Sequence, residues 1–312
     1  MIRVEVYEPQ QEAIWNEFLR TAKNRHFLFD RRYMDYHSKR FSDHSLLFYD
    51  EGELVAILPA NASGDLCISH QGLTFGGFIV QEASISTVRM LRVVEAALER
   101  LRADGFKRFV YKALPHIYHL RPAEEDIYAL FRFGAQVNQV DVTTTINLQA
   151  RGRVSSRRLR GVKKANKAGV AVRSSSEWRA FWPTLTQRLQ ERYAATPVHS
   201  ADEIEMLAKR WPHNIKLHVA TLAGEILAGL VVYETERVAH AQYISASKTG
   251  LELGALDALF ETQIVSYASK MQFFDFGIST ERAGHFLNEG LVSQKEGFGG
   301  SAIAHVTYAL PL

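Results

Sequence analysis

The sequence predicts an α/β protein, with α+β layers, that is built from two similar halves. Its 312 residues exceed the length of a usual single domain and favour two domains of roughly 150 residues each. Apolar residues make up 46% of the chain and charged residues 23%, as in a globular protein with a full hydrophobic core. The third observation is a series of helical and strand patterns that occurs twice. We therefore expect domains at residues 1–150 and 151–312.

The clearest part of the repeat is a pair of hairpins, each with a glycine at its turn. Residues 52–56 read GELVA and residues 224–228 read GEILA. In each copy the glycine permits a positive φ at the turn, and the residues after it are strand-like. Gly52 and Gly224 are therefore predicted to occupy equivalent turns.

The elements around the two hairpins follow the same order. Two helical stretches precede each hairpin, and a strand, a long helix, a strand, a short helix and a terminal strand follow it. In the first half these are residues 11–22, 31–40, 66–69, 85–105, 106–113, 124–134 and 140–148. In the second half they are residues 178–193, 201–211, 239–247, 253–270, 272–279, 281–290 and 302–310. Helices and strands mixed in this order are typical of layered α/β or α+β folds.

A dense basic segment lies where the halves join. Residues 151–167 hold eight Lys or Arg residues and no acid. Ser155 or Ser156 would begin a helix there and Gly169 would end it. The basic residues at three- and four-residue spacing, which would share one face of that helix, are Arg160, Lys163, Lys164 and Lys167. Such a face is either solvated surface or a site for the phosphates of a nucleotide, a lipid diphosphate or an RNA.

Several classes of protein are excluded. The single cysteine, Cys67, rules out a disulfide framework and a cysteine zinc site. His116 and His119 lack the further partners that a metal would need, so no metal site is predicted. The N-terminus has no secretory signal pattern, and no stretch approaches the ~18 apolar residues of a membrane span. These absences predict a cytoplasmic protein without an integral membrane segment.

Three stretches carry a resemblance to a known family. They are the basic segment RRLRGVKKANKAGV (157–170), FDFGIST (274–280) and QKEGFGG (294–300). With the element order, they resemble the FemABX-like (FemAB-type) branch of the GNAT acyltransferases. The resemblance implies two tandem GNAT-like domains with mixed central sheets. The first would be structural or acceptor-binding, and the second, with the basic helix at the join, would be catalytic.

The resemblance also implies a reaction. An N-acyltransferase of this kind would move an acyl or aminoacyl group onto an amine of a cell-envelope or polysaccharide precursor, either a small molecule or lipid-linked. The donor would be aminoacyl-tRNA or acetyl-coenzyme A, and no cofactor would be tightly bound. The coenzyme A loop of GNAT enzymes, Q/R-x-x-G-x-G/A, has no good match, because Gly250 and Gly254 are four residues apart and Thr74 replaces a glycine in the first half. This weighs against coenzyme A.

Acyl transfer to an amine needs a base for the amine and donors for the oxyanion. Asp275 and Glu281 flank a strand end and are the acid–base candidates, while Tyr243 could donate to the oxyanion or the leaving group. Alternatively, Asp275 caps a helix or turn, and Glu281 is an acid in the first turn of the helix expected at 281–290.

The stretch QKEGFGG is expected to form a turn with an exposed lysine. Lys295 would face an anionic group of a substrate or the oxyanion, Phe298 would wall the site, and Gly299 would permit close approach. His70, between glycines, could line the acceptor site or be a hydrogen-bonded structural histidine. The alternative for the stretch is a plain glycine turn with a solvent-facing lysine.

Two other functions stay open. One is a nucleic-acid-binding module that uses residues 151–167, although aromatic residues are not interleaved there. The other is a degenerate acyltransferase whose first domain is only structural. The first half has no match to FDFG, so we expect the chemistry in the second domain or at the join.

Overall fold

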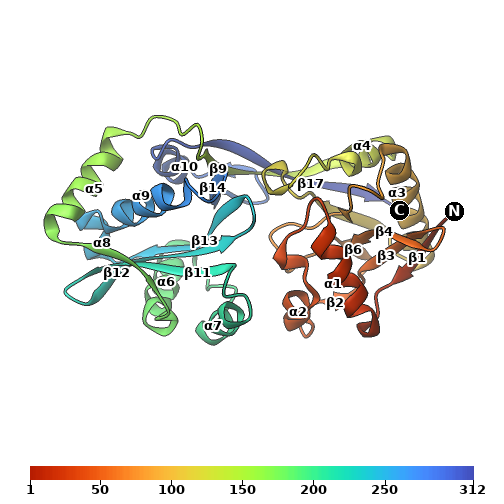
Figure 1. Ribbon diagram of the computed structural model, residues 1–312, viewed down its shortest axis with the longest axis horizontal. Helices are drawn as coiled ribbons and strands as arrows, with labels where there is room; N and C mark the ends of the chain where they lie inside the picture. The colour runs from red at the N-terminus through yellow and green to blue at the C-terminus, as the bar shows by residue number, and fades with distance from the viewer. The chain divides into compact units, whose positions relative to one another are not determined.

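The computed structural model describes residues 1–312, apart from the side chains of His37 and Tyr193. The chain forms two compact units, which are coloured from red to blue along the chain in Figure 1. The first unit comprises residues 1–141 and 304–312, and the second comprises residues 142–303. The chain thus leaves the first unit after Asp141 rather than after residue 150, and it returns to that unit at Ala304.

The first unit contains two groups of paired strands. Its elements are β1 (Ile2–Val6), α1 (Glu12–Thr21), α2 (Arg31–Met34), β2 (Ser42–Asp43), β3 (Leu46–Asp50), β4 (Glu53–Leu58), β5 (Asn61–Ser63), β6 (Leu66–Ile68), β7 (Ile79–Val80), α3 (Thr87–Ala103), β8 (Arg108–Lys112) and α4 (Glu125–Arg132). The strand orders are β1-β3-β4-β7 and β17-β8-β6-β5-β2, where β17 is Ser301–Pro311. The apolar face of α3 packs onto the core of these strands, with Val93, Val94 and Leu101 fully buried.

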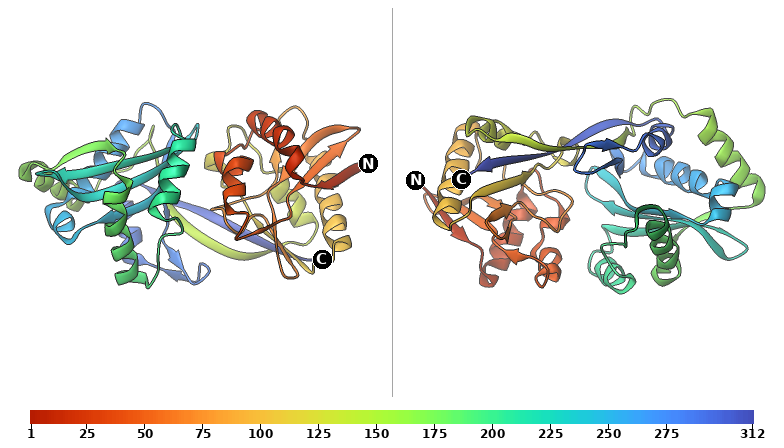
Figure 2. Two further views of the ribbon diagram at one scale, coloured as in Figure 1. Left: turned by 90° about the horizontal axis from the view of Figure 1, so that it is seen from below. Right: turned by 180° about the vertical axis from the view of Figure 1, so that it is seen from behind.

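The second unit is a sheet with helices on both faces. Its elements are α5 (Ser156–Ala168), β10 (Ala171–Ser175), α6 (Trp178–Tyr193), α7 (Ala201–Arg210), β11 (Ile215–Leu222), β12 (Glu225–Glu234), β13 (Val238–Ala246), α8 (Lys248–Leu253), α9 (Ala255–Tyr267), β14 (Phe273–Ile278), β15 (Thr280–Glu281), β16 (Phe286–Leu287) and α10 (Glu289–Glu296). The strand order is β10-β11-β12-β13-β14-β9, where β9 is Gln136–Asn147. Figures 1 and 2 show α9 on one face of this sheet and α6 and α7 on the other.

The two hairpins have the same form. Glu51 and Gly52 turn between β3 and β4 with φ of 52° and 88°, and Ala223 and Gly224 turn between β11 and β12 with φ of 49° and 86°. Positive φ at both central residues defines the tight turn whose twist suits a hairpin. Each hairpin also has a bulge at the same distance before its turn, after Phe48 in the first and after Ala220 in the second. The sequence repeat thus corresponds to a local structural repeat.

The terminal strands differ from the expectation that each closes its own half. Residues of β9 up to Asn147 pair with β14 in the second unit. The last strand, β17, pairs antiparallel with β8 in the first unit, from Thr307 opposite Lys112 to Pro311 opposite Arg108. Ala309 and Leu310 are buried in the first unit, which explains the pairing of β17 there.

The helix expected at residues 281–290 is wrong. This segment holds the short strands β15 and β16, joined through Arg282, Ala283 and Gly284, all with positive φ. Helix α10 begins only at Glu289, where the Asn288 side chain accepts a hydrogen bond from the amide of Leu291 at 3.0 Å. Gly284 in the strand connection and the capping Asn288 therefore place the start of the helix at Glu289, so that the helix runs into the QKEGFGG stretch.

Buried histidines predict that the protein loses stability in mild acid. Burial lowers the pKa of His70, His119 and His218 to about 4. Each titrates near pH 6.5 in the unfolded chain, so the unfolded state binds more protons between these values and stability falls as the pH falls. Asp126 acts oppositely, because burial raises its pKa to about 7 and its contribution is lost as the pH rises. Burial also raises the pKa of Asp35 and Asp257, but by smaller shifts. Since the three histidine shifts outweigh these carboxyl shifts, we expect the melting temperature to fall by at least about 5 °C from pH 6.5 to 4.5.

Circular dichroism at a series of pH values measures this change. His218→Gln should make the fall smaller, because one buried titrating group is removed. A melting temperature that stays constant or rises on acidification would contradict the prediction.

Candidate functional site

The strands β13 and β14 are parallel neighbours that part after three residue pairs. The pairs run from Val238 opposite Phe273 to His240 opposite Asp275. Beyond them β13 continues to Ala246, and in the part of the chain that the structure describes no strand pairs with it on this side. Where neighbouring strands separate inside a sheet, their main-chain amides and carbonyls are no longer paired with each other and can form hydrogen bonds with a substrate. This parting is the centre of the candidate site.

A bulge in β13 places two polar side chains on one face of the sheet. Val231 lies opposite Tyr243 and Val232 opposite Ala241, so Gln242 is an extra residue. In a regular strand residues three apart point to opposite faces, and one extra residue brings them to the same face. Ala239 and Ala241 belong to the core on the α9 side. His240 and Tyr243 therefore both face α6 and α7.

Asp275 is fully buried and receives hydrogen bonds from three side chains. The hydroxyls of Thr143 and Thr145 donate to its Oδ1, the latter at 2.8 Å. His240 Nδ1 lies 2.6 Å from its Oδ2. A carboxylate in this position holds the proton of the imidazole on Nδ1 and leaves Nε2 as the basic nitrogen. Asp275 lies within β14 and caps no helix, and its exposed fraction is 0%.

Lys295 is not the exposed residue that the sequence suggested. It lies in the last turn of α10 with only 5% of its surface exposed. Its ammonium donates to the carbonyls of Gly277 and Ile278 at 2.7 and 2.8 Å and to the hydroxyl of Ser279 at 2.8 Å. Burial lowers the pKa of Lys295 to about 8, and the carboxylate of Asp275 acts against that shift. Lys295 thus anchors α10 to the end of β14, and contact of its ammonium with a substrate stays a prediction.

Phe298 and Gly299 build the core behind the site. Phe298 is fully buried and stacks on Phe276 with ring centroids 5.6 Å apart. Gly299 has a φ of 91°, and a Cβ there would lie 2.3 Å from the carbonyl oxygen of Gly152. The glycine therefore permits close approach of the segment that leads into α5. In this structure both residues pack against protein, and their predicted contacts with substrate stay predictions.

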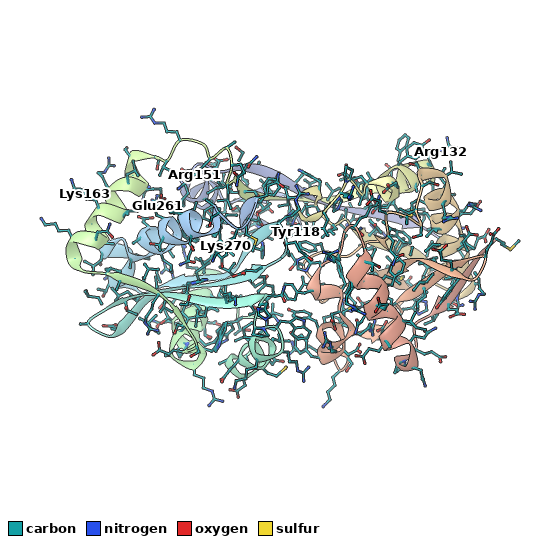
Figure 3. All side chains as sticks on the ribbon, viewed as in Figure 1. Tyr118, Arg132, Arg151, Lys163, Glu261 and Lys270 are labelled. Atoms are coloured by element: carbon teal, nitrogen blue, oxygen red, sulfur yellow. The ribbon has the colours of Figure 1, made fainter. Side chains whose placement is uncertain are left out.

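The basic helix α5 has a paired inner side and an unpaired outer side. Arg151, before the helix, forms a bidentate ion pair with Glu261 of α9, and Arg158 pairs with Asp257 of the same helix. Figure 3 shows Arg151 beside Glu261 and Lys163 on the outer side of α5. All four basic residues of the predicted phosphate face, Arg160, Lys163, Lys164 and Lys167, are exposed. Among the described side chains, none of these four has an acidic partner.

A cavity of about 710 Å³ lies between α5, the start of α9 and α10. Its polar lining includes Ser155, Arg157, Arg158, Asp257 and Glu296. Ser155 caps α5 by accepting from the amide of Arg158. Arg157 is exposed at this cavity and continues the outer basic side of α5. A phosphate-bearing ligand could bind here and extend along α5.

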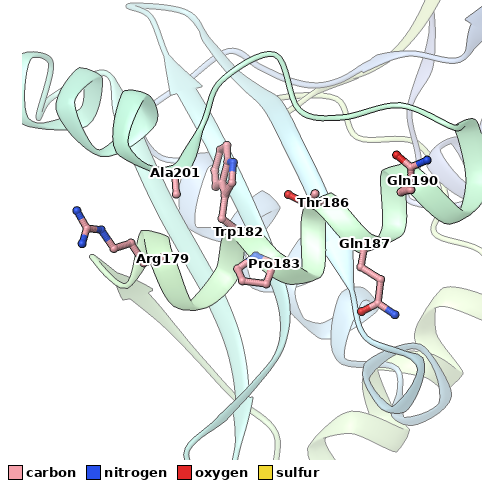
Figure 4. Close-up of a pocket in the computed structure, with 7 residues that line it drawn as sticks. All are labelled: Arg179, Trp182, Pro183, Thr186, Gln187, Gln190 and Ala201. Atoms are coloured by element: carbon pink, nitrogen blue, oxygen red, sulfur yellow. The ribbon is translucent and has the colours of Figure 1, made fainter.

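A second cavity, of about 640 Å³, opens on the outer side of α6. Figure 4 shows its lining by Trp182, Pro183 and Thr186 among other residues. Trp182 also contacts Tyr243 edge-on, with ring centroids 5.2 Å apart. The indole therefore separates this cavity from the face that carries His240 and Tyr243.

The remaining predicted residues lie in different surroundings. Tyr243 Oη is 2.5 Å from His199 Nδ1, and burial raises the pKa of Tyr243. Glu281 lies in β15 rather than in a helix and accepts a hydrogen bond from Asn288 at 3.1 Å. His70 is buried in the first unit, where its Nδ1 accepts from the amide of Gly72 at 3.2 Å. This hydrogen bond matches the structural reading of His70.

Sequence reasoning did not select His240 and His199. Pairing the second-half strands in parallel register would have placed His240 opposite Asp275. No local pattern marks His199, because it follows an irregular segment and meets Tyr243 only through the fold. Among the described residues, no helix is long and apolar enough to cross a membrane. Nor does any group of three or more His, Cys, Asp or Glu side chains in this part of the chain come together as a metal site would require.

Comparison with known proteins shows which family model and which solved structures this chain resembles. Residues 152–284 match the family described as acetyltransferase (GNAT) domain. FemX has a similar structure, with a TM-score of 0.70 and 12% identity over 99% of this chain and 97% of that chain. The C-terminal domain of a putative lysylphosphatidylglycerol synthetase from Agrobacterium fabrum is also similar, with a TM-score of 0.63 and 12% identity over 96% of this chain and 91% of that chain. None of the curated proteins compared matches the sequence.

A tandem GNAT protein from the clavulanic acid biosynthesis pathway is also similar. Its TM-score is 0.52, with 12% identity over 100% of this chain and 98% of that chain. At such low identity the structural likenesses establish the fold alone. They confirm the predicted α/β architecture with two tandem GNAT-like units.

Lys295→Ala is expected to lower both stability and turnover. The change removes the donor to the carbonyls of Gly277 and Ile278 and to the buried hydroxyl of Ser279, which we expect to reduce the free energy of unfolding by about 2 kcal/mol. Turnover should fall more than tenfold because the end of β14 loses its anchor, and Lys295→Arg should restore only part of it. Thermal melting and initial rates below the melting range measure the two effects.

Lys248→Ala is the matched control, because Lys248 is an exposed lysine of α8. An unchanged melting temperature in Lys295→Ala would contradict the anchoring role. Unchanged turnover would mean that the QKEGFGG stretch is only a structural turn with no part in the reaction.

Proposed function

We propose that the chain is a GNAT-superfamily acyltransferase, with the fold of FemABX-like tandem GNAT proteins, and that its second unit transfers an acyl or aminoacyl group to an amine. The acceptor would be a cell-envelope or polysaccharide precursor, small or lipid-linked, and the reaction would take place in the cytoplasm. The single observation that carries the proposal is the buried His240–Asp275 pair at the point where β13 and β14 part.

In the proposed step the acceptor nitrogen attacks the carbonyl carbon of the donor. His240 Nε2 takes a proton from that nitrogen as the N–C bond forms, and Asp275 stabilises the resulting imidazolium. Tyr243 remains protonated because burial raises its pKa, so its hydroxyl can donate to the oxyanion. The C–O or C–S bond to the donor then breaks, and the imidazolium returns the proton to the leaving group.

The cavity beside α5 is the proposed donor site. Both candidate donors carry phosphates, which would meet Arg157 and the outer side of α5. The amide of Ser247 donates to the carbonyl of Leu227 at 2.9 Å, and a Cβ on Gly250 would lie 2.2 Å from the same oxygen. The turn after β13 is thus packed on β12, which supports aminoacyl-tRNA over acetyl-coenzyme A.

The first unit is proposed to be structural or acceptor-binding. Its parallel pair, β6 and β8, also joins only three residue pairs, ending at Ile68 opposite Val110. The chain then folds back beside that end, since the amide of Ser69 donates to Val110 and the amide of Gly76 donates to Lys112. The chain's own backbone therefore uses groups that a substrate would need. This contrast supports placing the chemistry in the second unit.

A label-transfer screen tests the proposed function. The purified protein is incubated with total tRNA charged with ¹⁴C-labelled amino acids, or with ¹⁴C-acetyl-coenzyme A. The acceptors are muramyl peptides with a free amine, lipid-linked precursors and amino sugars. Transfer of label to an amine supports the proposal and identifies the donor, and absence of transfer from both donors to all acceptors would contradict it.

His240→Ala should lower kcat at least 100-fold with little change in KM, because the acceptor amine loses its base. Asp275→Asn should lower kcat about tenfold or more, because the amide cannot stabilise the imidazolium. His218→Gln is the control, since His218 is buried beside Tyr267 at 3.3 Å and outside the proposed site. Full activity in His240→Ala would rule out this base.

Replacing Arg160, Lys163 and Lys164 by alanine should weaken tRNA binding and leave the fold intact. Each contact with a phosphate releases counterions, so the salt dependence of binding should also become less steep. Filter binding of tRNA from 50 to 300 mM salt measures both, and exchange of Arg102 and Lys107 of the first unit is the control. Affinity that responds to neither salt nor these replacements would show that the face is solvated surface.

A further inference from the structure

The segment between α6 and α7 is joined to β13 by a buried pair of side chains. His199, just before α7, has its Nδ1 2.5 Å from Tyr243 Oη, and both residues are buried. The indole of Trp182 lies edge-on to Tyr243, and its Nε1 donates to the carbonyl of His199 at 3.0 Å. Three elements, α6, the α6–α7 segment and β13, therefore meet at one hydroxyl.

The position of this hydroxyl suits the reaction. The bulge at Gln242 brings Tyr243 to the face that carries His240, three residues beyond the last pair of β13 with β14. The Tyr243 hydroxyl is also hydrogen-bonded to the main chain of His199 and to the side chain of Gln242, and a substrate oxygen would be a further partner. If His199 Nδ1–H donates to Tyr243 Oη, the hydroxyl proton of Tyr243 is left for the oxyanion.

We propose that His199 is a positioning residue that donates from Nδ1 to Tyr243 and aims its hydroxyl proton at the oxyanion of the acyl-transfer step. This inference rests on the proposed function. No bond is made or broken at His199 or Tyr243. The hydrogen bond of Tyr243 to the oxyanion strengthens as negative charge forms on the carbonyl oxygen, and His199 keeps the phenol oriented meanwhile.

The proposal explains why the pair is buried and held from both sides. A hydroxyl that turns freely would lose the alignment on which oxyanion stabilisation depends. Trp182 restrains the ring of Tyr243 by its edge and restrains His199 through the main-chain carbonyl. The α6–α7 segment thereby becomes part of the site, although it lies far from β13 in the sequence.

Nitrogen-15 NMR of histidine-labelled protein tests the hydrogen bond without an assay. We expect a protonated Nδ1 for His199 with a proton signal shifted far downfield, and loss of that shift in Tyr243→Phe. An unprotonated Nδ1 would overturn the proposal, because Tyr243 would then donate its hydroxyl proton to His199 and could not donate it to the oxyanion.

Kinetics with charged tRNA and a muramyl peptide amine test the role in catalysis. His199→Phe and Tyr243→Phe should each lower kcat about 10- to 50-fold with little change in KM, and the double variant should be no slower than Tyr243→Phe. His199→Asn, which keeps a donor near Nδ1, should recover activity to within about threefold of the unchanged protein. Additive losses, or no rescue by asparagine, would leave His199 a purely structural residue and overturn the proposal.

Trp182→Phe gives a second test if His199→Phe does not fold, since it removes the donor to the His199 carbonyl and keeps an aromatic ring beside Tyr243, and it should lower kcat with little change in KM. An unchanged kcat would count against the proposal. The outcomes also separate the two proposals. Full activity in Tyr243→Phe with an inactive His240→Ala would overturn the role of His199 and keep the proposed function. Full activity in both variants would overturn the placement of the site at His240 and Tyr243, whereas absence of label transfer by the unchanged protein would overturn the proposed function itself.

Discussion

The second unit depends on the buried carboxylate of Asp275. A charge with no exposed surface is stable only when its oxygens are hydrogen-bonded, and here Thr143 and Thr145 of β9 and His240 of β13 supply those bonds. Asp275 therefore connects three neighbouring strands at the level where β13 and β14 part. Removing one partner would leave a buried charge incompletely bonded, so the same interaction that holds the strands also fixes the imidazole of His240.

The end of β14 is held from the other side by Lys295. Its ammonium binds the carbonyls of Gly277 and Ile278, at the irregularity in the pairing of β14 with β9, and Phe298 stacks on Phe276. QKEGFGG thus serves the site by joining α10 to β14 and by letting the segment before α5 approach at Gly299. Site, helix anchor and basic helix form one continuous structure within the second unit.

The two units share a local strand pattern but differ in the groups that surround it. Both contain the same hairpin turn, the same bulge before it and a parallel strand pair that ends after three residue pairs. In the first unit the chain's own amides bond at the end of that pair, whereas in the second unit His240, Tyr243 and Lys295 surround it. The difference lies in the side chains and the loop that follow the strands, which supports the proposal that only the second unit carries out the chemistry.

The sequence by itself determined the hairpins, the long helices, the basic helix and the order of elements, because turn glycines, caps and apolar periodicity act over a few residues. Asp275 and Tyr243 could also be selected from their place near a strand end. Only the tertiary structure decided that β17 pairs in the first unit, that Lys295 is buried, and that His240 and His199 face Asp275 and Tyr243. These features depend on contacts between residues at least 16 positions apart, on one extra residue at Gln242 and on the burial of a charge. No local pattern encodes such contacts, because their free energy exists only once the strands have packed.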